Sequence, residues 1–219
     1  LPWPTQPFPT RPAPFEYQGA TIDDLVDFTP EIRQMAIDAV EGFRLGPLFT
    51  PQSLTGTIQR PSTGGGANWS GAGGDPETGL LYVPSVNAFS VRNYREPEPG
   101  EGATLNIIEN RGAGTRGPTM PQGLPLFKPP YSRMTAINLG TGDHAWMQPM
   151  GDGARVRNHP LLRDLDLPPL GGDSSRAGPL VTKTLLVYAL TTGGTSDGPR
   201  LVGLDKASGE VLASVDLPS

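Results

Sequence analysis

The amino-acid sequence predicts a mainly β protein built as part of an open β-propeller. Glycine and proline, with 29 and 26 copies among 219 residues, make up about a quarter of the chain. The glycines cluster where turns are expected, and compact apolar runs of strand length lie between them. One turn pattern recurs at a spacing of 67 residues, from Ala136 to Gly203. Short strands in repeating units are typical of propeller blades.

Residues 1–63 are expected to form a region of their own, beginning with a proline-rich strap. Six of the first 14 residues are proline, which excludes a helix there. Trp3, Phe8, Phe15 and Tyr17 are interleaved with these prolines. We interpret residues 1–19 as an extended strap packed across another surface, with a disordered tail as the alternative.

One or two short helices are expected next, within residues 20–43. Thr29 is a suitable N-cap, and apolar residues then recur at steps of three and four. We expect this helix to end at Gly42 or Gly46. Residues 21–24 have the pattern of a capping box before a shorter turn of helix. We interpret this segment as a surface helix that packs through one apolar face, and we assign it no chemical role.

Residues 64–219 are expected to form the partial propeller. Segment 92–130 interrupts it and is rich in Gly, Pro, Arg and Glu, so we expect a long surface insertion there. The expected strands are 79–84, ended by Pro84, and then 134–138, 180–182, 185–190, 201–205 and 211–215.

The repeated turn occupies residues 136–146 and 203–213, with a partial copy at 75–79. A strand ends at Asn or Asp, whose side chain can accept hydrogen bonds from backbone N–H groups two residues on. Thr or Ser follows, and Gly then supplies a positive φ. At this spacing the region has room for roughly two and a half to three blades. Such an open set leaves blade faces and strand edges in need of a partner.

Composition excludes several classes of function. The net charge is −5 and the 17 Lys and Arg residues are scattered, so neither nucleic acid nor a polybasic membrane contact is expected. There is no cysteine, which excludes disulfides, thiolate metal sites and a Cys nucleophile. No apolar stretch approaches the ~20 residues of a membrane span. The first residues lack the basic start and apolar core of a signal peptide.

Two motifs resemble a known family. Residues 64–69 (GGGANW), followed by 74–84 (GDPETGLLYVP), resemble a stretch of pyrroloquinoline-quinone (PQQ)-dependent alcohol and glucose dehydrogenases. The repeated turn is similar to the tryptophan-docking motif of their eight-bladed propellers, in which the Trp packs between neighbouring blades. Trp146 fits this motif, whereas Ala213 departs from it. Parts of residues 6–51 look like the upstream region of the membrane glucose dehydrogenase branch.

The resemblance implies a PQQ site in the axial channel of the propeller. Asn68 matches the family Asn that contacts PQQ, and its amide offers donors and an acceptor to the cofactor oxygens. Trp69 could lie beside the cofactor. The alternatives are that Asn68 only turns the chain and that Trp69 fills an inter-blade core. Ser175 and Arg176, in a second glycine-containing loop at 171–179, could meet the PQQ carboxylates. A plain solvent-exposed turn is the alternative there.

The family also uses a calcium ion and an Asp base, but no catalytic residue or metal ligand for these roles is assigned in this sequence. We therefore expect a fragment or subunit of a periplasmic PQQ-dependent dehydrogenase that oxidises an alcohol or a glucose-type sugar and passes electrons to a quinone or dye. The chain alone is expected to be inactive. Its partner would be the N-terminal half of the propeller or another chain, and any membrane contact would come from parts outside this sequence. The alternative is a cofactor-free propeller module that acts in binding or assembly.

Overall fold

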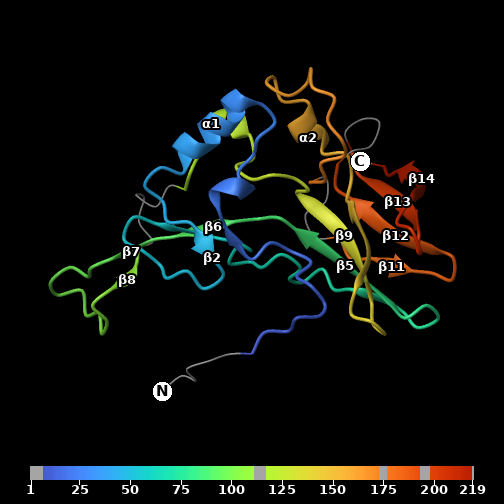
Figure 1. Cartoon of the computed structure of the whole chain (residues 1–219), viewed down its shortest axis with the longest axis horizontal. Helices are drawn as coiled ribbons and strands as arrows, with labels where there is room; N and C mark the ends of the chain where they lie inside the picture. Colours follow the sequence, from blue (N-terminus) through green and yellow to red (C-terminus); the bar gives the residue numbers. More distant parts are fainter. Residues whose placement is uncertain (1–6, 111–116, 173–176, 193–197, 219) are drawn as a thin grey trace.

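Two four-stranded antiparallel sheets form the centre of the computed structural model, which describes residues 7–110, 117–172, 177–192 and 198–218. Their strand orders are β10-β9-β5-β4 and β11-β12-β13-β14 (Figure 1). The first sheet contains β4 (Gly73–Asp75), β5 (Leu80–Val86), β9 (Ser132–Asn138) and β10 (His144–Pro149). The second contains β11 (Leu180–Val181), β12 (Leu185–Leu190), β13 (Arg200–Asp205) and β14 (Val211–Asp216). Each sheet has the strand number of one propeller blade, and the mainly β class is confirmed.

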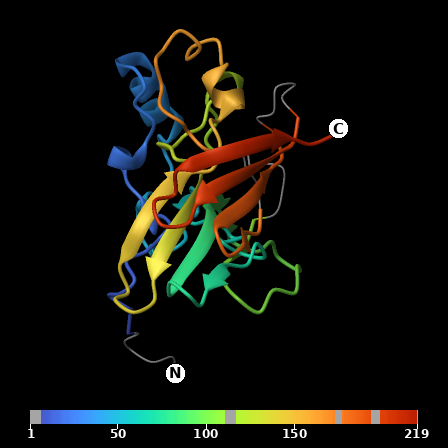
Figure 2. The ribbon, with the colours of Figure 1, turned by 90° about the vertical axis from the view of Figure 1, so that its right-hand side faces the viewer.

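An apolar core joins the two sheets. Tyr82 and Met134 from the first sheet and Leu186 and Leu204 from the second are buried in one cluster, with Trp146 packed against it. Alternate residues of β5, β9, β12 and β13 point into this cluster, as expected for sheets that pack through one face. Figure 2 shows the strands of the two sheets lying next to each other in this arrangement.

The strand β5 is longer than the sequence predicts. It continues through Pro84 to Val86 instead of ending at the proline. Pro84 is tolerated because β4 pairs only with residues 80–82, so β5 has no ladder partner on that side at residue 84. The other expected strands are present, and 180–181 and 185–190 form the predicted hairpin.

The predicted turns form as expected. The Asn138 side chain accepts hydrogen bonds from the backbone N–H groups of Gly140 and Thr141, at 2.9 and 3.2 Å. Asp205 makes the equivalent contacts after β13, at 2.9 and 2.8 Å. The partial copy at 75–79 joins β4 to β5, whereas the two full copies join the third strand of a sheet to the fourth. The three copies therefore belong to two sheets.

A second apolar cluster surrounds the helix α1 (Pro30–Ala39). Thr29 is its N-cap, and its hydroxyl accepts a hydrogen bond from Ile32 N at 3.2 Å. The helix ends at Ala39 and not at a glycine, because Val40 leaves the helical conformation and its side chain is buried in the cluster. The expected capping box is present: Thr21 N donates to the Asp24 carboxylate at 2.7 Å.

Part of segment 92–130 lies in this second cluster and not at the surface. Met120, Leu124, Leu126 and Phe127 are at most 8% exposed and pack with residues of α1. Four apolar side chains within eight residues explain this burial. The earlier part of the segment forms the small hairpin β7–β8, which projects from the molecule (Figure 1).

The remaining elements are short. They are β1 (Gly19–Ala20), a 3₁₀ helix (Ile22–Asp24), β2 (Gly46–Pro47), β3 (Thr57–Gln59), β6 (Ser90–Arg92), β7 (Tyr94–Arg95), β8 (Ile108–Glu109), a 3₁₀ helix (Pro121–Gly123) and α2 (Ala154–Arg157). The pairs β1–β2, β3–β6 and β7–β8 form two-stranded sheets. In the described part of the chain, no helix combines the length and the apolar character needed to cross a lipid bilayer.

The described residues 7–19 of the proline-rich strap contact the rest of the molecule, but residues 7–14 are exposed, and residues 15–17 are buried or half-buried. The Arg11 guanidinium donates to Thr141 O at 3.3 Å, and the His144 ring pairs with Ala13 O at 2.9 Å. The strap therefore crosses the turn between β9 and β10.

Candidate functional site

The predicted cofactor loop, residues 64–72, leads directly into β4. This strand is an edge of the first sheet and contacts β11, the corresponding edge of the second. Adjacent blades of a propeller converge toward the central channel. The place where β4 meets β11 is therefore the part of this structure expected to lie closest to that channel.

Asn68 and Trp69 project from this loop into solvent. Asn68 is exposed, and the Trp69 residue is 86% exposed. Trp69 also has a left-handed backbone, with φ 69°. Such a conformation costs a non-glycine residue about 1–3 kcal/mol and is frequent at ligand-binding positions. Among the described residues, Trp69 is not part of the core between the two sheets.

The described end of the second predicted loop, residues 177–179, lies beside the first loop. A methyl group added to Gly73 would meet the Val181 side chain at 2.6 Å, and one added to Gly178 would meet Ser70 O at 2.9 Å. The two glycine-containing loops thus come together at the inner edges of the two sheets. Ser175 and Arg176, the predicted contacts of the second loop, lie outside the described residues.

A group of buried charges, which the sequence did not predict as a site, lies behind the cofactor loop. The Glu16 carboxylate is 2.5 Å from an Arg133 guanidinium nitrogen, and both side chains are 7% exposed. The Tyr17 ring lies against two guanidinium groups, with its centroid 4.6 Å from Arg133 Cζ and 4.1 Å from Arg60 Cζ. Burial lowers the pKa of Arg60, and Asp24 opposes that shift. The only sign of this buried charge group in the sequence is Glu16, the first acidic residue of the chain, which lies within a proline-rich segment.

The sequence also did not predict the role of Lys206 in joining the two sheets. Its ammonium donates to Asp75 Oδ2 at 2.6 Å and to Thr182 O at 3.1 Å. Its backbone carbonyl accepts from Trp146 Nε1 at 3.0 Å and from the Tyr82 hydroxyl at 3.2 Å. Trp146 therefore docks on the neighbouring sheet, as the motif predicts.

These contacts shift the pKa values of both charged groups. The hydrogen bond from Lys206 is the main reason that the pKa of Asp75 lies below its ordinary value. The same bond holds the pKa of Lys206 above its own ordinary value. Both groups are therefore charged at neutral pH, and the pair fixes the turn after β4 to the turn after β13.

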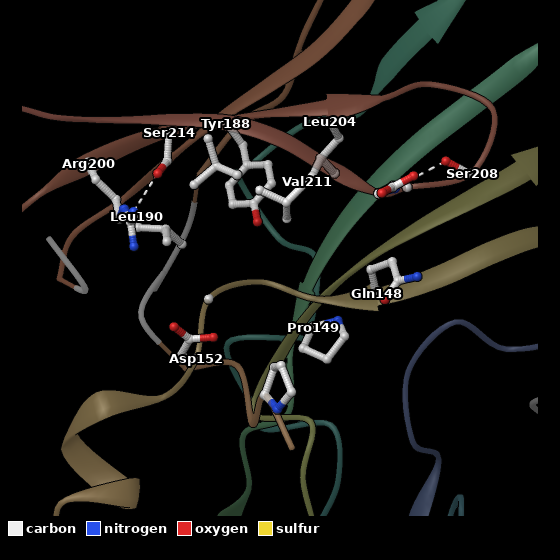
Figure 3. A pocket seen from close by; sticks show the side chains of 15 residues that line it. Gln148, Pro149, Asp152, Tyr188, Leu190, Arg200, Leu204, Ser208, Val211 and Ser214 are labelled. Carbon is white, nitrogen blue, oxygen red and sulfur yellow. Dashed lines mark hydrogen bonds between the residues drawn. The ribbon is translucent and has the colours of Figure 1, made fainter. Parts of the chain in front are cut away.

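A cleft of about 730 Å³ opens between the two sheets (Figure 3). Its wall on the second sheet contains Tyr188, Leu190, Leu204 and Val211, and Asp152 lies across from them. None of its lining residues belongs to the loops 64–72 or 177–179. The cleft extends the apolar core between the sheets, so we do not assign the cofactor site to it. Among the described residues, no three acidic or His side chains lie close enough together to hold a metal ion.

Comparisons with known proteins identify the family. The whole chain, residues 1–219, matches the PQQ family model described as glucose/ethanol/alcohol dehydrogenase, beta-propeller domain. It is 26% identical over 201 residues to the quinoprotein glucose dehydrogenase of Escherichia coli (strain K12), covering 80% of this chain and 24% of that protein. It is 23% identical over 202 residues to the quinate/shikimate dehydrogenase (quinone) of Acinetobacter baylyi, covering 81% and 24%.

Solved structures give a weaker match. The quinohemoprotein alcohol dehydrogenase of Comamonas testosteroni aligns with a TM-score of 0.43 and 18% identity, over 74% of this chain and 20% of that one. The chain spans about a quarter of the length of the curated relatives it matches. Its match to the family model over every residue shows that this chain belongs to the β-propeller family of PQQ-dependent glucose, ethanol and alcohol dehydrogenases.

Proposed function

We propose that this chain forms part of the PQQ-binding wall of a dehydrogenase that oxidises an alcohol or a sugar. The observation that carries the proposal is the Asn68–Trp69 turn, which combines an exposed amide, an exposed indole and a left-handed backbone at the inner edges of two blades. Family membership gives the cofactor its identity.

The residues on this turn fit a flat, polar cofactor. The Asn68 amide can donate to and accept from quinone and carboxylate oxygens, and the Trp69 ring offers an aromatic face or edge. Ser175 and Arg176 are proposed as further contacts to carboxylates, on the basis of the sequence alone. Bound PQQ supplies the redox chemistry, and these residues bind and orient it.

The remaining parts of the enzyme are proposals that rest on the family. We expect the calcium ligands, the catalytic acid and the rest of the propeller ring to come from regions outside this chain. We also expect the enzyme to be periplasmic. Relatives named for glucose, quinate or shikimate and glycerol indicate a hydroxyl-bearing substrate. We also propose that residues 1–63 and 64–219 correspond to the strap-and-helix region and the blade region of that enzyme.

Titration of the chain with PQQ and calcium tests the proposal, with and without the rest of the propeller supplied as a separate chain. Absorbance reports binding, and dye-coupled oxidation of alcohols and sugars reports activity. Trp69→Ala should weaken PQQ binding about tenfold, because an aromatic contact of about 1.5 kcal/mol corresponds to that factor. Asn68→Ala should also weaken binding.

Phe49→Ala is a matched control for Trp69→Ala. Phe49 is also aromatic, 69% exposed and left-handed, with φ 67°, but lies outside the cofactor loop. Its replacement should leave PQQ binding unchanged. If PQQ fails to bind even with the rest of the propeller present, the dehydrogenase proposal is wrong and a cofactor-free module takes its place.

A further inference from the structure

We propose that Glu16, in the proline-rich strap, is a positioning residue for the Asn68–Trp69 turn. The reading of that turn as a cofactor contact rests on the proposed function. The mechanical part of the proposal does not, because it concerns contacts within this chain. Glu16 lies on a different segment from the turn and acts on it through Gly66.

The first step is the contact between Glu16 and the cofactor loop. A methyl group added to Gly66 would lie 2.7 Å from Glu16 Cγ, closer than packed atoms allow, and 3.3 Å from Glu16 Cβ, a tight contact. On β5, Val86 N donates to Gly66 O at 2.8 Å. The loop is therefore held between the strap and the end of β5, two residues before Asn68.

The second step is that Glu16 itself cannot move freely. Its Oε1 accepts from Arg133 at 2.5 Å and from Tyr17 N at 3.0 Å. Arg133 is buried, so losing its partner would leave an uncompensated charge in the interior. The Tyr17 ring, which contacts the guanidinium groups of both Arg133 and Arg60, holds the adjacent residue of the strap.

The third step is that the position of the Asn68–Trp69 turn depends on the contacts on either side of it. Ser70 and Gly73 are fixed on the other side by Gly178 and Val181 of the neighbouring sheet. Between these contacts, the 86% exposed Trp69 residue has little packing of its own to orient it. Loss of the Glu16 contact should therefore loosen the turn while the two sheets remain folded.

Trp69 fluorescence tests this directly. Trp3→Phe, combined with subtraction of the same protein carrying Trp69→Phe, isolates the Trp69 signal. In this background, Glu16→Ala should lower the anisotropy of Trp69 and increase its quenching by acrylamide. Glu16→Gln keeps Cγ but weakens the bond to Arg133, so it should have the same effect to a smaller extent. Circular dichroism should show that the sheets persist.

Two control variants separate positioning from general loss of stability. Glu41→Gln removes an exposed acid beyond α1, and Ile32→Val makes a small cavity in the α1 cluster. Both should leave the Trp69 signal unchanged. If Glu16→Ala folds and the Trp69 anisotropy and quenching equal those of the unsubstituted protein, the positioning role is overturned.

A double-mutant cycle tests the contact from its other side. Gly66→Ala should loosen Trp69, and should cost less stability when Glu16→Ala has already removed Cγ, because the 2.7 Å clash is then gone. Additive effects would overturn the proposal. If Glu16→Ala does not fold, Glu16→Gln and Gly66→Ala decide by the same Trp69 readout.

PQQ titration separates this proposal from the proposed function. Glu16→Ala should raise the PQQ dissociation constant about tenfold, the lower end of the effect of outer supports on a binding site. If the unsubstituted chain binds no PQQ with the rest of the propeller present, yet Glu16→Ala loosens Trp69, the cofactor assignment fails and the positioning role stands. If the unsubstituted chain and Glu16→Ala bind PQQ equally tightly and give the same Trp69 anisotropy and quenching, the positioning role fails and the cofactor assignment stands.

Discussion

Lys206 makes four contacts across the interface between the sheets. Its ammonium and its carbonyl reach Asp75, Thr182, Trp146 and Tyr82. In the turn repeat it occupies a position that varies between copies, so the repeat indicates the turn but not this role. A lysine at this position can contribute a charge from its side chain and an acceptor from its backbone at the same time.

The Asp75–Lys206 pair should make the free energy of unfolding decrease at both acidic and alkaline pH. The pKa of Asp75 is below its ordinary 3.8, so its contribution is present above that value and lost as the pH falls through the lower, folded-state pKa. The pKa of Lys206 is above its ordinary 10.5, so its contribution is lost as the pH rises through the higher, folded-state pKa. Urea unfolding at pH 2–5 should show a weaker acid dependence for Asp75→Asn than for the unsubstituted chain. Equal dependence would contradict the assignment.

Trp146 should contribute to the joining of the sheets through both its ring and its N–H. Trp146→Phe keeps an aromatic ring against Tyr82 but loses the bond to Lys206 O, and should cost about 1 kcal/mol. Trp146→Ala should cost about 2–4 kcal/mol, because the half-buried ring is lost as well. Urea unfolding measures both values. A cost for Trp146→Ala no larger than for Trp146→Phe would show that the ring contributes little.

At the scale of elements, local chemistry determines the turns and the helix start. The side chains of Asn138 and Asp205 satisfy backbone N–H groups within a few residues, and this pattern is visible in the sequence. The helix end is different, because burial of Val40 decides it and burial is not a local property. For the same reason, the sequence could not show that Pro84 lies within β5.

The N-cap of α1 gives a prediction at this scale. Thr29→Ala removes the hydroxyl that accepts from Ile32 N and should destabilise the protein by about 1 kcal/mol. Thr29→Ser keeps that acceptor and should cost much less. Urea unfolding followed by circular dichroism compares the two variants. Equal costs would mean that the Thr29 methyl group, and not its hydroxyl, contributes the stability.

At the scale of the whole molecule, β14 is an exposed sheet edge. In the described residues it pairs with β13 alone, and Val211, Leu212 and Val215 are 59%, 55% and 64% exposed. An open edge that carries apolar side chains favours pairing with another chain. In a closed propeller ring, neighbouring blades would cover the faces of such a sheet.

We therefore expect the chain on its own to associate as its concentration rises. Light scattering after size-exclusion chromatography should show this, and Leu212→Lys combined with Val215→Lys should shift the population toward monomer. Leu139→Lys, at a 63% exposed residue in a turn, is the control and should not. A monodisperse monomer of the unsubstituted chain at every concentration would contradict the expectation.

The sequence predicted the fold class, most strands and the docking of Trp146, because each depends on local patterns or on family resemblance. It did not predict the Glu16–Arg133 and Asp75–Lys206 pairs. Their partners lie 117 and 131 residues apart, and neither partner carries a local motif for the other. The burial of Phe127 was missed because a Gly- and Pro-rich composition obscures a short apolar run.

The Glu16–Arg133 pair also has a consequence for synthesis of the chain. Because 117 residues separate the partners, Glu16 leaves the ribosome well before Arg133. At about 5–20 residues per second the delay is roughly 6–23 seconds. During that interval Glu16 lacks its partner Arg133, and the prolines of the strap exclude a helix there, so this segment stays extended until β9 has been made.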